Sequence, residues 1–226
     1  MRKLIYVPIV HTTADMGSQA EALEREHVRR HGRGEWARTR RLIDEVWEGL
    51  RTRLLALALD YRGVRIYQDG LPVCGRELDI VREVAQAGSR NYTLILELLK
   101  RGAVVEGTES PDLLREEYER IRSAIPKKSV PRGRMQTGEL ASAGLPDQAR
   151  EESARESERI LRQRDEFIGR RIDETLKGGE VGILFIGLMH WVDRFLPGDV
   201  EVQYLIHRLP FHIPPGEPGQ RRGHDA

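Results

Sequence analysis

The chain has 226 residues, enough for one sizeable hydrophobic core. Charged residues make up 32% of it, yet basic and acidic residues balance to a formal net charge of +1. Without an excess of one sign, neither nucleic acid nor an anionic membrane is favoured as a partner. The single cysteine, Cys74, excludes an internal disulfide framework and is typical of a reducing cytoplasm.

The sequence also argues against secretion and membrane insertion. The basic N-terminus is followed by only about half a dozen apolar residues, fewer than the roughly 7–15 of a signal-peptide core. No other run approaches the ~20 apolar residues of a membrane span. We therefore expect a soluble, cytoplasmic protein that is not attached to a membrane.

Short apolar runs alternate with helical segments along the chain. Strands are predicted at residues 3–10, 63–67, 102–106, 181–187 and 200–206. Helices are predicted at residues 19–60 (with a break at 32–34), 76–87, 91–100, 111–125 and 147–177. This order predicts an α/β fold, with a mostly parallel core sheet of four or more strands flanked by helices.

The predicted fold is a single domain over residues 1–209. Residues 126–148 are rich in Pro, Gly, Ser and basic residues and show little periodicity. At that length the segment exceeds an ordinary connection, so we expect a flexible lid or loop inserted in the helical region. The composition of residues 210–226 predicts a disordered tail.

A histidine follows each of two predicted core strands. The run Val181–Gly187 is apolar throughout, which is typical of a strand covered on both faces, and His190 comes just after it. His11 follows the strand at residues 3–10 in the same way. A lone histidine is usually structural, but ligands of open α/β sheets bind at the carboxyl ends of strands. Imidazole at that edge is a natural metal ligand or general base.

Two carboxylates follow other predicted strands. Asp69 is either an ordinary residue of an Asp-Gly turn or a carboxylate at the same sheet edge as the histidines. The negative charge of Glu109 either stabilises the positive N-terminal end of the next helix, or its carboxylate serves as a metal ligand. Two imidazoles with one or two carboxylates can hold a divalent transition metal, such as manganese, cobalt or zinc, and leave a position for water. A spare carboxylate would then accept a proton as general base.

The second half of the chain resembles a known group of proteins. Gln163-Arg164-Asp165, then the rest of a helix, a glycine pair, an apolar strand and Gly187-Leu-Met-His190 resemble the C-terminal half of the TraB/Tiki proteins. The wider group includes erythromycin esterase-like and ChaN-like proteins. The residues that match its order of histidines, acidic residues and arginine are His11, Asp69, Glu109, Arg164 and His190.

The chain departs from the group's pattern at two positions. Its first motif is Pro8-Ile-Val-His11, where the group has Gly-x-x-His, and Asp69 stands where the group usually has glutamate. The resemblance implies an α/β core with a metal-dependent, peptidase- or esterase-like hydrolase site that acts on a small-molecule or peptide substrate. His11 and His190 would be metal ligands, and Asp69 and Glu109 ligands or bases.

Arg164 would stabilise a developing oxyanion or clamp an anionic group of the substrate. Taken alone, Arg164 is more often a helix-surface arginine paired with Glu158 or Asp165. Motifs of serine hydrolases, phosphate loops and helical zinc proteases are absent. Cys74, beside a turn, is either a nucleophile or a buried small apolar residue, and the buried role is the favoured interpretation.

Two other functions stay open at this point. One is a protein that binds haem, iron or a small ligand in the same place without turnover. The other is an interaction module that acts through its arginine-rich helices, at residues 25–53 and 150–174.

Overall fold

The computed structural model describes residues 1–9, 20–124 and 147–206. In this part of the chain five strands form one sheet in the order β3-β2-β4-β1-β5, and all of its pairings are parallel. The strands are β1 (Arg2–Ile9), β2 (Val64–Gln68), β3 (Val104–Glu106), β4 (Val181–Gly187) and β5 (Val200–Tyr204). The predicted α/β class and the mostly parallel sheet are thereby confirmed.

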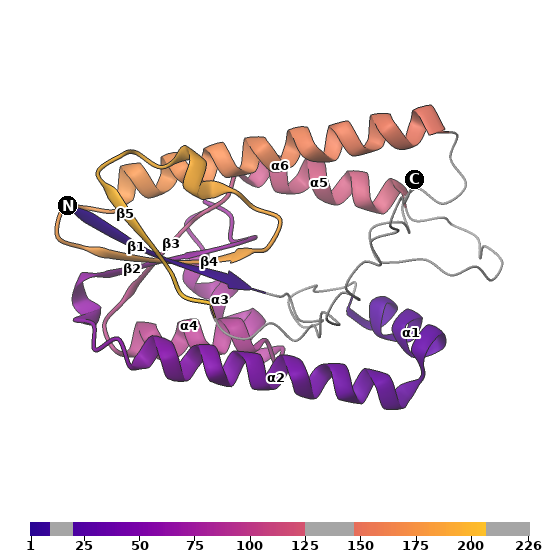
Figure 1. Cartoon of the computed structure of the whole chain (residues 1–226), viewed down its shortest axis with the longest axis horizontal. Coiled ribbons are helices and arrows are strands. Elements are labelled where there is room, and N and C mark those ends of the chain that lie inside the picture. Colours follow the sequence, from indigo (N-terminus) through magenta and orange to yellow (C-terminus); the bar gives the residue numbers. More distant parts are fainter. Residues whose placement is uncertain (10–19, 125–146, 207–226) are drawn as a thin grey trace, which may run out of the picture.

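Helices cover both faces of the sheet, which gives three layers (Figure 1). The helices are α1 (Ala20–His31), α2 (Arg33–Leu55), α3 (Glu77–Gln86), α4 (Arg90–Lys100), α5 (Pro111–Ala124) and α6 (Asp147–Thr175). Two short 3-10 helices, η2 (Tyr61–Gly63) and η3 (Val192–Phe195), complete the described elements. Helices α2, α3 and α4 cover one face, and α6 with η3 covers the other.

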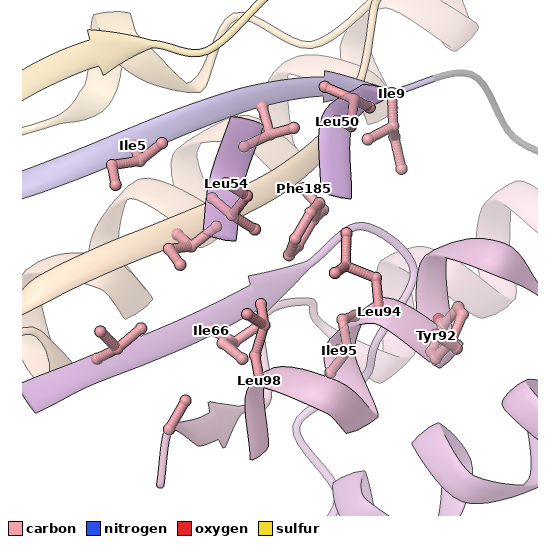
Figure 2. Packing of buried hydrophobic residues seen from close by; sticks show 14 of the residues in the cluster. Ile5, Ile9, Leu50, Leu54, Ile66, Tyr92, Leu94, Ile95, Leu98 and Phe185 are labelled. Carbon is pink, nitrogen blue, oxygen red and sulfur yellow. The ribbon is translucent and has the colours of Figure 1, made fainter. Parts of the chain in front are cut away.

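The central strand β4 shows why its sequence is apolar throughout. It pairs with β1 at one edge and with β2 at the other, so it is a central strand, and helices cover both of its faces. Ile183 and Phe185 pack toward α2 and α4, whereas Leu184 and Ile186 pack toward α6. Figure 2 shows Phe185 among the buried hydrophobic side chains on the α2 and α4 side of the sheet, which include Leu54 and Ile66. Each fully buried side chain of this size contributes roughly 1.5–3 kcal/mol through burial.

The parallel arrangement brings the carboxyl ends of the strands to one edge of the sheet (Figure 1). Gln68, the last residue of β2, lies opposite Phe185 of β4, and Ile9 of β1 lies opposite Gly187. After β2 the chain continues to the face covered by α3, whereas after β4 it continues to η3 on the other face. Such a divergence at neighbouring strands is where open α/β sheets bind ligands.

Helix α6 buries one narrow stripe against the sheet. Its apolar members Ile160, Ile168 and Ile172, together with Leu176 just after the helix, are spaced in fours and at most 1% exposed. Four residues make about one helical turn, so these positions share one face. The remaining position of this stripe is Arg164, which is also buried. A charged side chain is thus placed at the centre of an apolar stripe.

Several sequence predictions meet the structure at this level. His11, nearly all of the predicted lid at 126–148 and the predicted tail at 210–226 lie outside the described residues. The interpretation of Cys74 as buried is wrong, because its side chain is exposed. Cys74 stands in the turn that enters α3, where its N–H and that of Gly75 donate to the Glu77 carboxylate. Among the described helices, none is long and apolar enough to cross a membrane.

The contact between α6 and η3 depends on a glycine. A Cβ atom at Gly169 would lie 2.8 Å from the carbonyl oxygen of Phe195 and 2.9 Å from its Cβ. We expect Gly169→Ala to lower the free energy of unfolding by about 1–3 kcal/mol, because α6 and η3 must separate. Gly34→Ala is the matched control: nothing lies within 4 Å of its Cβ position in α2, so alanine should be neutral or stabilising by up to about 1 kcal/mol. Urea unfolding measures both, and equal effects would contradict the close approach.

Candidate functional site

Asp69 is delivered to the sheet edge by a tight turn at the end of β2. The Leu71 N–H donates to the Gln68 carbonyl at 3.1 Å, and Gly70 adopts the positive φ of 76° that this turn requires. The Asp69 carboxylate then accepts from the backbone N–H of Gly187, at the end of β4, at 2.9 Å. The turn interpretation and the sheet-edge interpretation of Asp69 therefore both hold.

Glu109 reaches the same place from the loop after β3. Its backbone N–H donates to the Leu71 carbonyl at 3.0 Å, and its Oε1 accepts from the Gly70 N–H at 3.2 Å. The side chain is fully buried. Glu109 does not cap α5, since Ser110 Oγ accepts the Leu113 N–H at 3.4 Å instead.

Arg164 joins these carboxylates from the opposite layer. Its Nε donates to Glu109 Oε2 at 3.0 Å, and its Nη2 donates to Glu109 Oε1 at 2.5 Å and to Asp69 Oδ1 at 2.8 Å. Its Nη1 donates to Glu117 of α5 at 2.6 Å. Burial alone would lower the pKa of Arg164, but the hydrogen bonds to Glu109 and the nearby carboxylates raise it above its usual value. Arg164 is therefore a fixed cation.

His190 is held by a carboxylate from α6. Its Nδ1 lies 2.5 Å from Asp165 Oδ1, and the other oxygen of Asp165 accepts the Trp191 N–H at 2.9 Å. Because a carboxylate accepts, the Nδ1 of His190 carries a hydrogen and its Nε2 faces Asp69 Oδ2 at 3.6 Å. Burial favours the neutral ring, but Asp165 and Asp69 outweigh it and raise the pKa of His190.

The cluster carries more negative than positive charge. Four carboxylates (Asp69, Glu109, Glu117 and Asp165) contact one guanidinium and one imidazole. Complete burial raises the pKa of Glu109 in spite of its hydrogen bonds with Arg164. Counted by formal charge, the four carboxylates outnumber the two groups that can carry positive charge. An added cation would remove that imbalance.

Three side chains of the cluster form a donor set for a metal ion. One atom each of Asp69, Glu109 and His190 lies within 4.8 Å of the others. Asp69 Oδ2 and His190 Nε2, at 3.6 Å, are too far apart for a hydrogen bond. Two ligands of a tetrahedral ion with bonds of about 2.0–2.1 Å are separated by about 3.4 Å, close to this value. Asp165 provides the outer carboxylate that orients metal-binding histidines. The residues present therefore fit a divalent transition metal.

The structure gathers four of the five sequence-predicted site residues into one cluster: Asp69, Glu109, Arg164 and His190. Whether they bind metal or catalyse stays a prediction, and His11 lies outside the described residues. The alternative pairing of Arg164 with Glu158 or Asp165 is wrong, because Arg164 is buried and contacts other carboxylates.

Two members of the cluster escaped the sequence reasoning. The sequence suggests Asp165 only as a partner of Arg164, whereas in the structure Asp165 orients His190. No sequence pattern points to Glu117 of α5, which contacts Arg164. The signal for Asp165 was its place next to Arg164, on the face of α6 that is buried.

The cluster is largely buried, and its most exposed side chain is that of Glu117, at 28%. The side chains of Asp69, Glu109, Arg164 and His190 are at most 7% exposed. Two surface hollows, of about 420 and 670 Å³, lie elsewhere, over α1 and the start of α2 and beside α3, α4 and β3.

No protein family, curated protein or solved structure matches this chain. The assignment of a function therefore rests on the geometry of the cluster and on the sequence pattern.

The Asp165 contact makes a pH-dependent prediction for metal-free protein. Replacing Asp165 by Asn should lower the pKa of His190, because the main interaction that raises it is lost. A raised folded-state pKa stabilises the fold below the unfolded value of about 6.5, and this contribution disappears as the pH rises through the folded pKa. The stability gap between wild type and variant should therefore be largest below about pH 6.5. NMR titration of the His190 ring measures its pKa, and urea unfolding at several pH values measures the stability gap. An unchanged pKa in the variant would contradict the contact between Asp165 and His190.

Proposed function

We propose that this chain is a metal-dependent hydrolase, peptidase- or esterase-like, whose site is the cluster at the carboxyl ends of β2, β3 and β4. The observation that carries this proposal is that carboxylates outnumber positively charged groups around three side chains that can bind a metal ion. Buried charges in proteins are normally paired or bound to metals, because an isolated charge is costly away from water. A divalent cation at Asp69, Glu109 and His190 would complete the pairing.

The resemblance to the TraB/Tiki proteins supports the same reading independently. It singled out Asp69, Glu109, Arg164 and His190 by their order in the sequence, and these residues lie within one network of contacts. Residues 69 and 190 are far apart in the chain, so chance would not readily bring all four together. Membership of that group is part of the proposal, as is a cytoplasmic location, which the single cysteine favours.

Each residue has a role that follows from its contacts. Asp69, Glu109 and His190 would hold the ion, with His11 predicted as a further ligand. A bound divalent ion polarises a carbonyl group and lowers the pKa of a water molecule toward ~7. Asp165 fixes the hydrogen of His190 on Nδ1, which leaves the Nε2 lone pair directed at the donor set.

Arg164 and Glu109 would act on the substrate side of the reaction. Arg164 is a preorganised cation that stabilises negative charge developing on a carbonyl oxygen of a small-molecule or peptide substrate. Glu109 would act as a general base where it does not bind the ion, and burial raises its pKa, which favours its accepting a proton. Arg164 donates hydrogen bonds to both oxygens of Glu109, and its positive charge favours the ionised form of that carboxylate.

The near-complete burial of the cluster favours a second candidate function. A site whose metal-binding side chains are nearly buried is suited to hold an ion or a small ligand and leaves little surface for a substrate to contact. In that case the chain binds iron, another metal ion or a small ligand without turnover. The interaction module is less favoured, because arginines of its helices are already paired, as Arg159 with Glu156 and Arg162 with Glu166 show.

Metal content tests the proposal. We expect protein purified without an affinity tag to hold about one manganese, cobalt or zinc ion per chain by mass spectrometry. His190→Ala should lose it, and Asp165→Asn should weaken metal binding by about 10–100-fold, because the outer carboxylate orients His190. Asp193→Asn is the matched control: this exposed carboxylate in η3 accepts a hydrogen bond from the Tyr204 hydroxyl at 2.9 Å and is not one of the three donor side chains, so metal content should be unchanged.

Hydrolysis of p-nitrophenyl esters and of peptidyl coumarins then separates the two candidates. Turnover that is lost in His190→Ala but not in Asp193→Asn supports the hydrolase. A bound ion without turnover of any substrate favours the binding protein. No metal in wild type, even after addition of manganese, cobalt, zinc and iron, would contradict the hydrolase and the metal-binding form of the second candidate, and would leave only the binding of a small ligand.

A further inference from the structure

Two buried amide side chains, those of Gln68 and Asn91, lie behind the turn that carries Asp69. Gln68 is the last residue of β2, Asn91 belongs to the first turn of α4, and both are at most 1% exposed. Gln68 shares a face of β2 with Ile66, two residues earlier, which packs on the α2 and α4 side of the sheet. The pair therefore approaches Asp69 from the layer opposite to α6.

A chain of hydrogen bonds joins the two amides to Asp69. Asn91 Nδ2 donates to Gln68 Oε1 at 2.8 Å, and Gln68 Nε2 donates to the Asp69 carbonyl at 2.9 Å. A backbone carbonyl can only accept, so Gln68 must turn its nitrogen toward Asp69 and its oxygen toward Asn91. The direction of the whole chain of hydrogen bonds is thereby fixed.

The chain continues through the peptide group between Asp69 and Gly70 to Glu109. The carbonyl oxygen of this peptide group accepts from Gln68, and its N–H donates to Glu109 Oε1 at 3.2 Å. Because a peptide group is planar, a fixed carbonyl also sets the direction of the N–H. Three amides in a row thus direct their N–H groups toward the Glu109 carboxylate, and the hydrogen bonds of such a chain polarise one another.

Both ends of the chain are anchored in the fold. The backbone N–H of Gln68 donates to Thr108 Oγ1 at 2.9 Å, and Thr108 is the residue before Glu109. Ser89 caps the N-terminus of α4, so it fixes the helical turn on which Asn91 lies. The amide pair consequently links α4 and the loop after β3 to the turn that carries Asp69.

Stability alone does not explain why these two residues are polar. Asn91 Oδ1 is buried and has no hydrogen-bond partner in the described part of the chain. A buried acceptor without a partner is unfavourable, whereas two apolar side chains of the same shape would avoid that cost. A polar pair that is kept in spite of this cost, one hydrogen bond away from the site, points to a role in the site.

We propose that Gln68 and Asn91 are positioning residues of the candidate site. They fix the peptide group between Asp69 and Gly70, and through it the arrangement of the Asp69 and Glu109 carboxylates. The proposal rests on the proposed function, because these two carboxylates belong to the donor set for the metal ion.

The consequence is that Glu109 is held from both layers of helices. Arg164 donates to it from α6, and the Gly70 N–H, which the amide pair orients, donates to it from the side of α4. A carboxylate held in this way is already ordered before a cation arrives. Outer residues that orient ligands typically contribute about 10–100-fold to metal affinity.

The test replaces both amides by apolar side chains. Gln68→Leu/Asn91→Leu removes the pair without leaving one half of it unpaired. Tyr67→Phe is the matched control, because it removes the buried bond of the Tyr67 hydroxyl with Thr175 Oγ1 at 2.8 Å, in the same strand but on the other face of the sheet. Asn91→Leu alone leaves the Gln68 donor in place and serves as a second test variant should the double variant not fold.

Amide hydrogen exchange of the metal-free protein measures the positioning itself. We expect the Gly70 amide to exchange roughly tenfold faster or more in the double variant, relative to the amide of Ile183 in β4, because Gly70 loses its fixed direction toward Glu109. The ratio of the two exchange rates removes any change in global stability. Tyr67→Phe should leave this ratio unchanged. An unchanged ratio in the double variant and in Asn91→Leu would overturn the proposal.

Manganese affinity, measured by isothermal titration calorimetry, connects the positioning to the site. We expect affinity to fall by about 10–100-fold in the double variant and by roughly tenfold in Asn91→Leu, with Tyr67→Phe equal to wild type. Equal affinity in all four proteins would overturn the proposal and leave the metal site standing. If wild type binds no manganese, the metal site is refuted, and the exchange of Gly70 alone decides whether the pair positions the turn.

Discussion

The buried contact of Arg164 with Asp69 and Glu109 is the interaction on which this structure depends. It joins the carboxyl ends of β2 and β3 to α6, and Asp69 in turn holds the start of the His190 loop through Gly187. Loss of one partner of such a pair would leave an uncompensated buried charge, at a cost of about 3–5 kcal/mol. The same contact leaves negative charge in excess, since Glu117 and Asp165 also belong to the cluster. The same buried charged residues therefore contribute to the stability of the fold and form the proposed metal site.

Much of the fold follows from the sequence because its patterns are local. The continuous apolar run of β4 predicts a strand covered on both faces, and the packing of its side chains against α2 and α4 on one face and α6 on the other confirms this. The approach of Asp69, Glu109 and His190 also follows from a simple rule, because parallel strands end at one edge. What the rule does not give is the pairing of charges across layers. That depends on the rotation of α6 about its axis, which is set by packing.

The sequence predicts the burial of Arg164 but not its partners. Positions 160, 164, 168 and 172 are spaced in fours, and an arginine within an apolar stripe predicts a buried charge that needs partners. Asp165, the next residue, is an obvious candidate partner by sequence, but in the structure it contacts the ring of His190. The error at Cys74 has the opposite cause: the hydrophobic character of the side chain was weighed above the turn that exposes it. Partners of charged residues come from tertiary packing, which a single sequence does not display.

The central claim is that the cluster of Asp69, Glu109 and His190 accepts a divalent cation. The most direct test is anomalous X-ray diffraction from crystals grown with manganese, at wavelengths on both sides of its absorption edge. The account predicts one strong peak within about 2.0–2.3 Å of a donor atom of each of these three side chains. Arg164 should stay in contact with Glu109. A cluster without a peak, while exposed carboxylates elsewhere bind manganese, would contradict the claim and leave the buried charges with a purely structural role.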